Sequence, residues 1–204
     1  MNMVLNWLRS PAVVWHYRRI WLDALALTII STVSVWLIWS ANGLTTIQIF
    51  DENAPHEMLQ SVFLGLAVIL SAISAWRAEP FGRYLSISVA LICYIFFFRE
   101  VPVCKGEIVS LCTSRPPRTL SIAGGAIALL LSTVFYEIRY RGTLLKAIHP
   151  ALSWPLALAA FALFGSQVME RLHLMAIEET LELYAYAVLL LASLSFMRHG
   201  NRYR

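Results

Sequence analysis

Three glutamates near the carboxyl-terminal end of the sequence have a spacing that could support chemistry. Glu178 and Glu182 are four residues apart, and Glu179 and Glu182 are three apart. On a helix, residues at these separations occupy neighbouring positions on one face. Carboxylates placed so closely repel one another, so the group favours a bound cation, a proton or an arginine. Arg99 and Arg171 are the nearest basic residues in the expected topology, and Arg99 is the simplest partner.

The same end of the predicted helices contains further ionisable and amide side chains. Such groups are costly at membrane depth, so each is a candidate for a functional site. Glu182 lies deepest, and Glu100 directly follows an aromatic run. The alternative is that these carboxylates only complement positive helix ends and form salt bridges at the membrane surface. The predicted binding set consists of Glu57, Gln60, Arg99, Glu100, Glu178, Glu179 and Glu182.

Glu170 and His173 form a Glu-x-x-His pair at the end of the fifth apolar stretch. Pairs with this spacing ligate metals in four-helix di-iron proteins, which contain two such pairs and two further glutamates. This sequence has one pair, to which His56 could add a second imidazole. A divalent-metal site formed by Glu170, His173 and His56 is therefore an alternative, in which a glutamate would act as the general base.

Any such site must be positioned by membrane-spanning helices, because the composition is unusual for a soluble domain. Of the 204 residues 59% are hydrophobic and only 14% are charged, and the mean hydropathy is +0.66. A helix needs about 20 apolar residues to cross the hydrocarbon core. The sequence predicts an all-α integral membrane protein, a single domain of about six transmembrane helices, with spans over residues 22–42, 57–77, 81–100, 118–137, 150–170 and 178–198.

Two of these spans are long enough to cross the bilayer only if they include charged residues. The third and the sixth uncharged stretches contain only 15 residues each. To cross the bilayer, the third helix must include residues near Arg83 and near Arg99 and Glu100, and the sixth must include Glu178, Glu179 and Glu182. The candidate site residues are therefore expected within the helices, and not in the loops between them.

The basic residues predict the orientation in the membrane. If the amino terminus is cytoplasmic, 11 of the 16 Lys and Arg residues lie in cytoplasmic segments. This agrees with the positive-inside rule, and it explains the net charge of +4 without nucleic acid. We predict a bacterial inner-membrane location, with both termini cytoplasmic and the acidic ends of the helices outside. Residues 1–19 predict a short interfacial segment and not a cleaved signal peptide.

Two cysteines lie in the longest predicted loop, between the third and fourth spans. If Cys104 and Cys112 face an oxidising compartment, a disulfide between them is expected. A two-thiolate metal site is the alternative. Cys93 lies within the third span, where we expect it to be packed among apolar side chains.

The sequence contains no Gly-rich phosphate loop, His-Glu-x-x-His helix or Gly-x-Ser-x-Gly elbow, so whether the protein is an enzyme stays open. We expect an outer-facing acidic pocket that binds or transports a cation or a polar lipid headgroup. One alternative is a metal-dependent, membrane-embedded enzyme that modifies a lipid. Another is a non-catalytic subunit of a larger membrane complex.

The expected partner of every helix is the lipid bilayer. Small residues at helical spacing in the fourth span would let another helix approach closely, within the bundle or in a homo-oligomer. These residues are Ser121, Gly124, Gly125 and Ala128.

Overall fold

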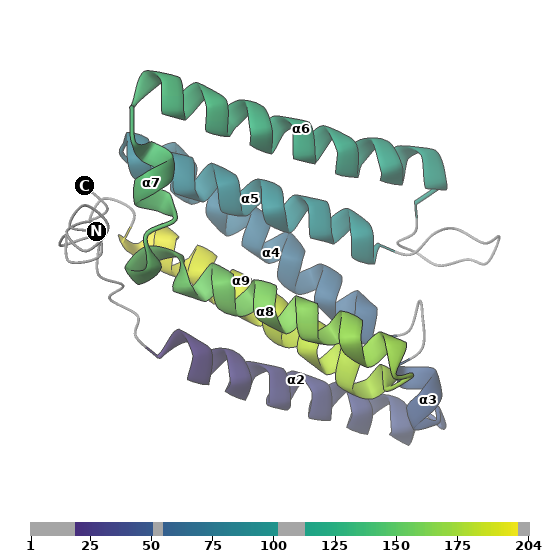
Figure 1. Ribbon diagram of the computed structural model, residues 1–204. Helices are drawn as coiled ribbons and strands as arrows, with labels where there is room; N and C mark the ends of the chain where they lie inside the picture. The colour runs from purple at the N-terminus through teal and green to yellow at the C-terminus, as the bar shows by residue number, and fades with distance from the viewer. Residues whose placement is uncertain (1–18, 51–54, 102–112, 200–204) are drawn as a thin grey trace.

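The computed structural model describes residues 19–50, 55–101 and 113–199, and within them it forms a bundle of six long helices (Figure 1). Each long helix is apolar enough to span a membrane, so the protein is an integral membrane protein. The predicted all-α bundle is confirmed, and every predicted span end lies within three residues of a helix end. The long helices are α2 (Ile20–Ala41), α4 (Pro55–Arg77), α5 (Pro80–Glu100), α6 (Arg115–Arg139), α8 (Pro150–Arg171) and α9 (Met175–His199).

Two short helices connect the long ones at opposite ends of the bundle. The helix α3 (Thr46–Ile49) follows α2, and α7 (Thr143–Ala147) crosses from α6 to α8 (Figure 1). Proline stands in the first turn of α5, α6 and α8, where a missing N–H removes no intrahelical hydrogen bond. These prolines therefore fix where the helices begin.

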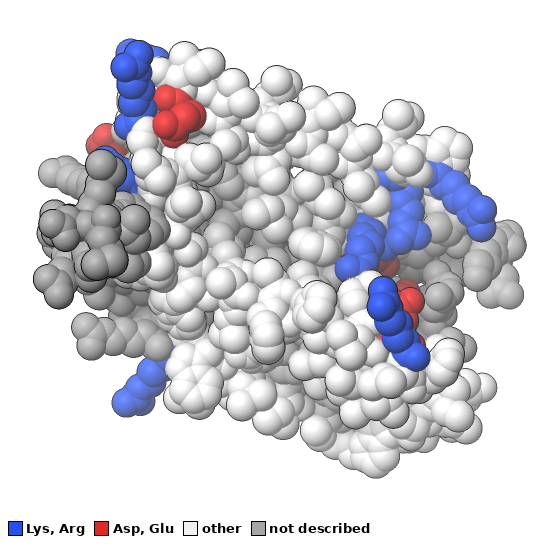
Figure 2. Space-filling view, in the orientation of Figure 1, with Lys and Arg blue, Asp and Glu red and all other residues white. Residues whose placement is uncertain are grey.

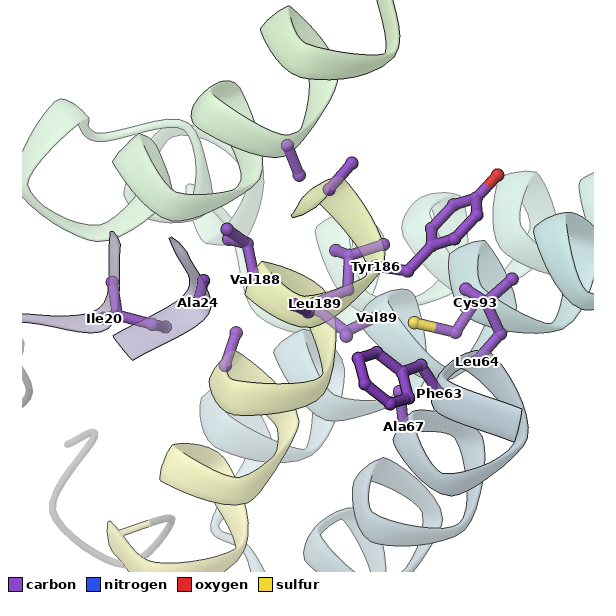
Figure 3. Packing of buried hydrophobic residues seen from close by; sticks show 14 of the residues in the cluster. Ile20, Ala24, Phe63, Leu64, Ala67, Val89, Cys93, Tyr186, Val188 and Leu189 are labelled. Atoms are coloured by element: carbon purple, nitrogen blue, oxygen red, sulfur yellow. The ribbon is translucent and has the colours of Figure 1, made fainter. Parts of the chain in front are cut away.

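The last long helix, α9, lies at the centre of the bundle. It packs against α2, α4, α5 and α8. In its most apolar window 61% of the residues are buried inside the protein, compared with 11% for α2 and for α6. Figure 3 shows side chains from α2, α4, α5 and α9 meeting in one core, which includes the fully buried Cys93. The elements that carry the candidate site are thus held together by α9.

The helix α6 packs on the outer side of α5, and glycine makes the close approach possible. A Cβ atom added to Gly125 would lie 2.8 Å from Cγ1 of Ile95 and 3.1 Å from the ring of Tyr94. A Cβ atom added to the neighbouring Gly124 would meet nothing within 4 Å. At Gly125, the small residues of the fourth span therefore contact another helix of the same bundle, α5.

On the face shown in Figure 2, charged side chains gather at the two ends of the bundle, and a broad surface between them carries no Lys, Arg, Asp or Glu side chains. We call the end at which α5 ends and α9 begins the acidic end. The opposite end, at which α6 ends and α8 begins, is called the basic end. Large apolar side chains are exposed along the sides, as expected for surfaces in contact with lipid.

Two features predicted from the sequence lie outside the described residues. The first is the interfacial segment, of which only residue 19 is described. The second is the pair Cys104 and Cys112. The predicted disulfide therefore stays a prediction.

Candidate polar site at the acidic end

Arg99, in the last turn of α5, binds two glutamates. Its Nη2 atom donates a hydrogen bond of 2.5 Å to Oε1 of Glu182 in α9, and its Nε atom lies 3.3 Å from Oε1 of Glu100. The glutamate side chains are only 4% and 6% exposed, whereas that of Arg99 is 38% exposed. A guanidinium group can bind two acceptors at once because its donors lie in a rigid plane. Arg99 is therefore the exposed member of a trio whose carboxylates are buried.

Two buried hydroxyl groups hold the same carboxylates in place. Tyr186, one turn after Glu182 on α9, donates a hydrogen bond of 2.7 Å to Oε1 of Glu100. Ser166 of α8 donates a hydrogen bond of 3.1 Å to Oε1 of Glu182. Hydrogen bonds to an ionised acceptor are stronger than those between neutral groups. These five residues from α5, α8 and α9 form what we call the Arg99 cluster.

A second polar group connects α4 with the start of α9. Nε2 of Gln60 donates hydrogen bonds to Oε2 of Glu179 at 2.7 Å and to its backbone oxygen at 3.1 Å. Nδ1 of His56 lies 3.3 Å from that same Nε2 atom and 3.4 Å from Oε2 of Glu179. His56 and Gln60 are completely buried. We call these three residues the Gln60 cluster.

The two clusters belong to one site. Glu179 of one cluster and Glu182 of the other are three residues apart on α9, so they occupy neighbouring positions on the same helix. Among the described residues, Nε2 of His56 and Oε1 of Gln60 have no hydrogen-bond partner. Buried polar atoms in native proteins are nearly always hydrogen-bonded. These two atoms therefore have unused capacity to bind a ligand or an ordered water molecule.

The charge balance of the Arg99 cluster is unusual for a buried site. Glu100 and Glu182 share a single guanidinium group, so the trio has one excess negative charge when all its members are ionised. Transferring an unpaired charge from water to a medium of low dielectric constant is costly. A cation or a proton at this position would remove that cost. The geometry therefore favours a cationic ligand over an anionic one.

The remaining members of the predicted binding set lie at the rim of the site. Glu57 and Glu178 are half-buried. Glu57 directly follows His56 on α4, and Glu178 directly precedes Glu179 on α9. All seven predicted binding residues are thus brought to the acidic end, where Glu100 and Glu182 are buried and Arg99 is partly exposed.

Glu170 and His173, the predicted metal ligands, are exposed at the turn between α8 and α9. His173 has a φ of 57° and ends α8 in a Schellman motif, in which its N–H donates to the Glu170 oxygen and the Leu174 N–H to the Met169 oxygen. Among residues 19–50, 55–101 and 113–199, no three His, Cys, Asp or Glu side chains could hold a metal ion together. The described chain therefore does not assemble the set of Glu170, His173 and His56.

Sequence reasoning did not identify Tyr186 and Ser166 as members of the site. The position of Tyr186 four residues after Glu182 was a usable signal, because residues at this spacing share a helix face. Ser166 carried no comparable signal, because its relation to Glu182 depends on how α8 packs on α9. Arg118 was also not selected, and its Nη2 atom donates a hydrogen bond to the backbone oxygen of Arg99. This contact joins the start of α6 to the end of α5.

No family model matches the chain, and neither a curated protein nor a solved structure matches it. The functional conclusion therefore depends on the geometry of the site.

Proposed function

We propose that this integral membrane protein binds a cation at its acidic end and holds or transports it there. The observation that carries the proposal is the sharing of Arg99 by two buried carboxylates, Glu100 and Glu182. A site built only for structural pairing would need one carboxylate for one guanidinium. The second carboxylate gives the site an affinity for a positive ligand.

Two neutral side chains of the Gln60 cluster, Gln60 and His56, support the same proposal. The free amide oxygen of Gln60 is an acceptor, and a hard cation or an ammonium group is a suitable partner for it. The buried ring of His56 offers its Nε2 atom, which has no hydrogen-bond partner among the described residues, as a second neutral group. A mixed site of carboxylates, an amide and an imidazole can bind a proton or the ammonium group of a lipid headgroup, and a metal cation would need further ligands, such as water.

The position of the site suits exchange with one side of the membrane. Its carboxylates lie within the last turn of α5 and the first two turns of α9, close to the ends of the helices. The distribution of Lys and Arg supports an outward-facing acidic end. We therefore propose that the ligand enters from the outer face, and that Arg99, the most exposed member of the trio, moves to admit it.

The test is cation-dependent stability of the detergent-purified protein. A ligand that binds the folded state raises the melting temperature in a concentration-dependent manner. We would titrate sodium, calcium and ethanolamine separately, and also vary the pH, with wild type, Glu182→Gln and Glu170→Gln. Glu170 is the matched control because it is an exposed glutamate at the same end.

We expect at least one of these cations, or the proton, to stabilise the wild type and the Glu170→Gln variant and to lose that effect in Glu182→Gln. Equal responses of all three proteins would overturn the proposal. A stable Glu182→Gln variant with no cation response in any protein would also overturn it, and would favour a structural role in a larger membrane complex. Flux of the identified cation into proteoliposomes then separates transport from binding.

A further inference from the structure

A cleft of about 460 Å³ lies at the basic end of the bundle, far from the Arg99 cluster along the helices. It opens between the start of α5 and the chain that leaves α6 and enters α7. Two basic side chains and one acidic side chain line it, together with aromatic and hydroxyl groups. The lining includes Glu79, Phe81, Tyr140, Arg141, Thr143 and Lys146.

We propose that this cleft binds the phosphate group of a membrane phospholipid. Arg141 and Lys146 line the same cleft and are both exposed. A guanidinium group binds phosphate through two parallel hydrogen bonds, and an ammonium group adds a compact positive charge. Glu79 is the single carboxylate in the lining, so the cleft has an excess of one positive charge.

The turn that carries Arg141 is held by hydrogen bonds from the backbone. Gly142 has a φ of +83°, which a residue with a side chain rarely adopts. The carboxylate of Glu137 accepts hydrogen bonds of 2.8 Å from the N–H of Gly142 and 2.9 Å from the N–H of Leu144. Arg139 lies over the ring of Tyr140, at 5.3 Å from its centroid. The chain that bounds the cleft therefore forms a hydrogen-bonded turn.

Apolar residues beside the cleft favour a lipid over a soluble phosphate. Leu144, Leu145 and Ile148 are 42%, 59% and 51% exposed, on or next to α7. This short helix crosses the end of the bundle between α6 and α8 (Figure 1). Exposed apolar side chains next to basic ones are typical of a segment at the boundary between headgroups and acyl chains. A phospholipid would satisfy both, with its phosphate in the cleft and its acyl chains beside α7.

The simpler interpretation is that these basic residues only orient the protein in the membrane. Arg77 and Arg198 serve as the control for this interpretation, because they lie at the same end and do not line the cleft. A purely orienting role predicts that all four basic residues contribute equally to lipid binding. A specific cleft predicts that Arg141 and Lys146 dominate.

The experiment is native mass spectrometry of the delipidated, detergent-purified protein with a short-chain phosphatidylglycerol. The matched probes are the corresponding diacylglycerol, which lacks the phosphate, and inorganic phosphate, which lacks the chains. We expect the phospholipid to bind and both probes to bind far more weakly. Arg141→Gln/Lys146→Gln should weaken phospholipid binding about thirtyfold, and Arg77→Gln/Arg198→Gln should leave it nearly unchanged.

A variant that gains binding shows that the losses do not come from misfolding. Glu79→Gln removes the repulsive carboxylate, so we expect about fivefold stronger binding of the anionic phospholipid. Equal weakening in the two double variants, or no gain in Glu79→Gln, would overturn the proposal. Binding of inorganic phosphate as strong as that of the phospholipid would overturn the assignment to a lipid.

Discussion

Arg99 and Glu182 are 83 positions apart in the sequence, yet their side chains are joined by a hydrogen bond of 2.5 Å. The contact connects the end of α5 to the second turn of α9. These two helices make far fewer contacts with each other than α9 makes with α4 or α8. Because Glu100 approaches the same guanidinium group, this single arginine determines the charge balance of the buried site.

The first prediction follows from that shared arginine. Arg99→Gln leaves two buried carboxylates without their cation, and we expect a loss of about 2 kcal/mol in the free energy of unfolding. Adding Glu182→Gln to this variant removes one of the two unpaired buried carboxylates, and should recover part of the lost free energy of unfolding. Unfolding in detergent, followed by tryptophan fluorescence, measures both effects. Adding Glu170→Gln instead should recover nothing, and equal recovery by both second substitutions would contradict the prediction.

The second prediction concerns the hydroxyl group of Tyr186. Tyr186→Phe removes the buried donor to Glu100 and should reduce the free energy of unfolding by about 1–2 kcal/mol. The matched control is Tyr184→Phe, because the Tyr184 hydroxyl makes a longer, exposed bond of 3.4 Å to the Trp21 backbone. We expect the control to retain wild-type stability, and comparable losses in both variants would argue against the assigned role of Tyr186.

The six spans could be predicted because the signal for each is local. A long apolar stretch in lipid must satisfy its own backbone hydrogen bonds, and a helix does so without any knowledge of its neighbours. The inclusion of Arg99, Glu100 and residues 178–182 in helices also followed from length alone, since 15 uncharged residues do not cross a bilayer. The structure places all of them in α5 and α9.

The partners within the site were harder to predict because they depend on helix order. The pairing of Arg99 with a carboxylate was expected, and it is observed with Glu182. The hydrogen bond between Gln60 and Glu179 requires that α4 lie next to α9 in the bundle. The sequence contains no local feature that specifies this neighbour. The same is true of Ser166, which reaches Glu182 only because α8 and α9 form an antiparallel pair.

The third prediction uses two adjacent glycines in α6. Gly125→Ala would place a methyl group 2.8 Å from Ile95, so we expect a loss of about 1–3 kcal/mol in the free energy of unfolding as α6 is pushed from α5. Gly124→Ala has open space around it and should not destabilise the protein. Thermal unfolding of the two variants in the same detergent provides the comparison. A less stable Gly124→Ala variant would show that this surface is covered by a partner.

The fourth prediction distinguishes a structural role of His173 from a metal-binding role. Its positive φ costs a residue with a Cβ atom about 1–2 kcal/mol, and glycine avoids this cost. We expect His173→Gly to be at least as stable as wild type and His173→Val to be less stable. Melting temperatures, measured with and without a chelator, test this expectation. A chelator-sensitive wild type together with a destabilised glycine variant would instead support a metal ligand at this position.

The central place of α9 has a consequence for how the protein is made. Among the six spans, α9 is the last to emerge from the ribosome, but it provides the surface on which α2, α4 and α8 pack. Until it enters the bilayer, the polar side chains of Gln60, Arg99 and Glu100 lack their partners from α9. The bundle of the earlier spans therefore stays incomplete until α9 joins it. A chain truncated before residue 175 would keep these polar groups unpaired, which is costly within a bilayer.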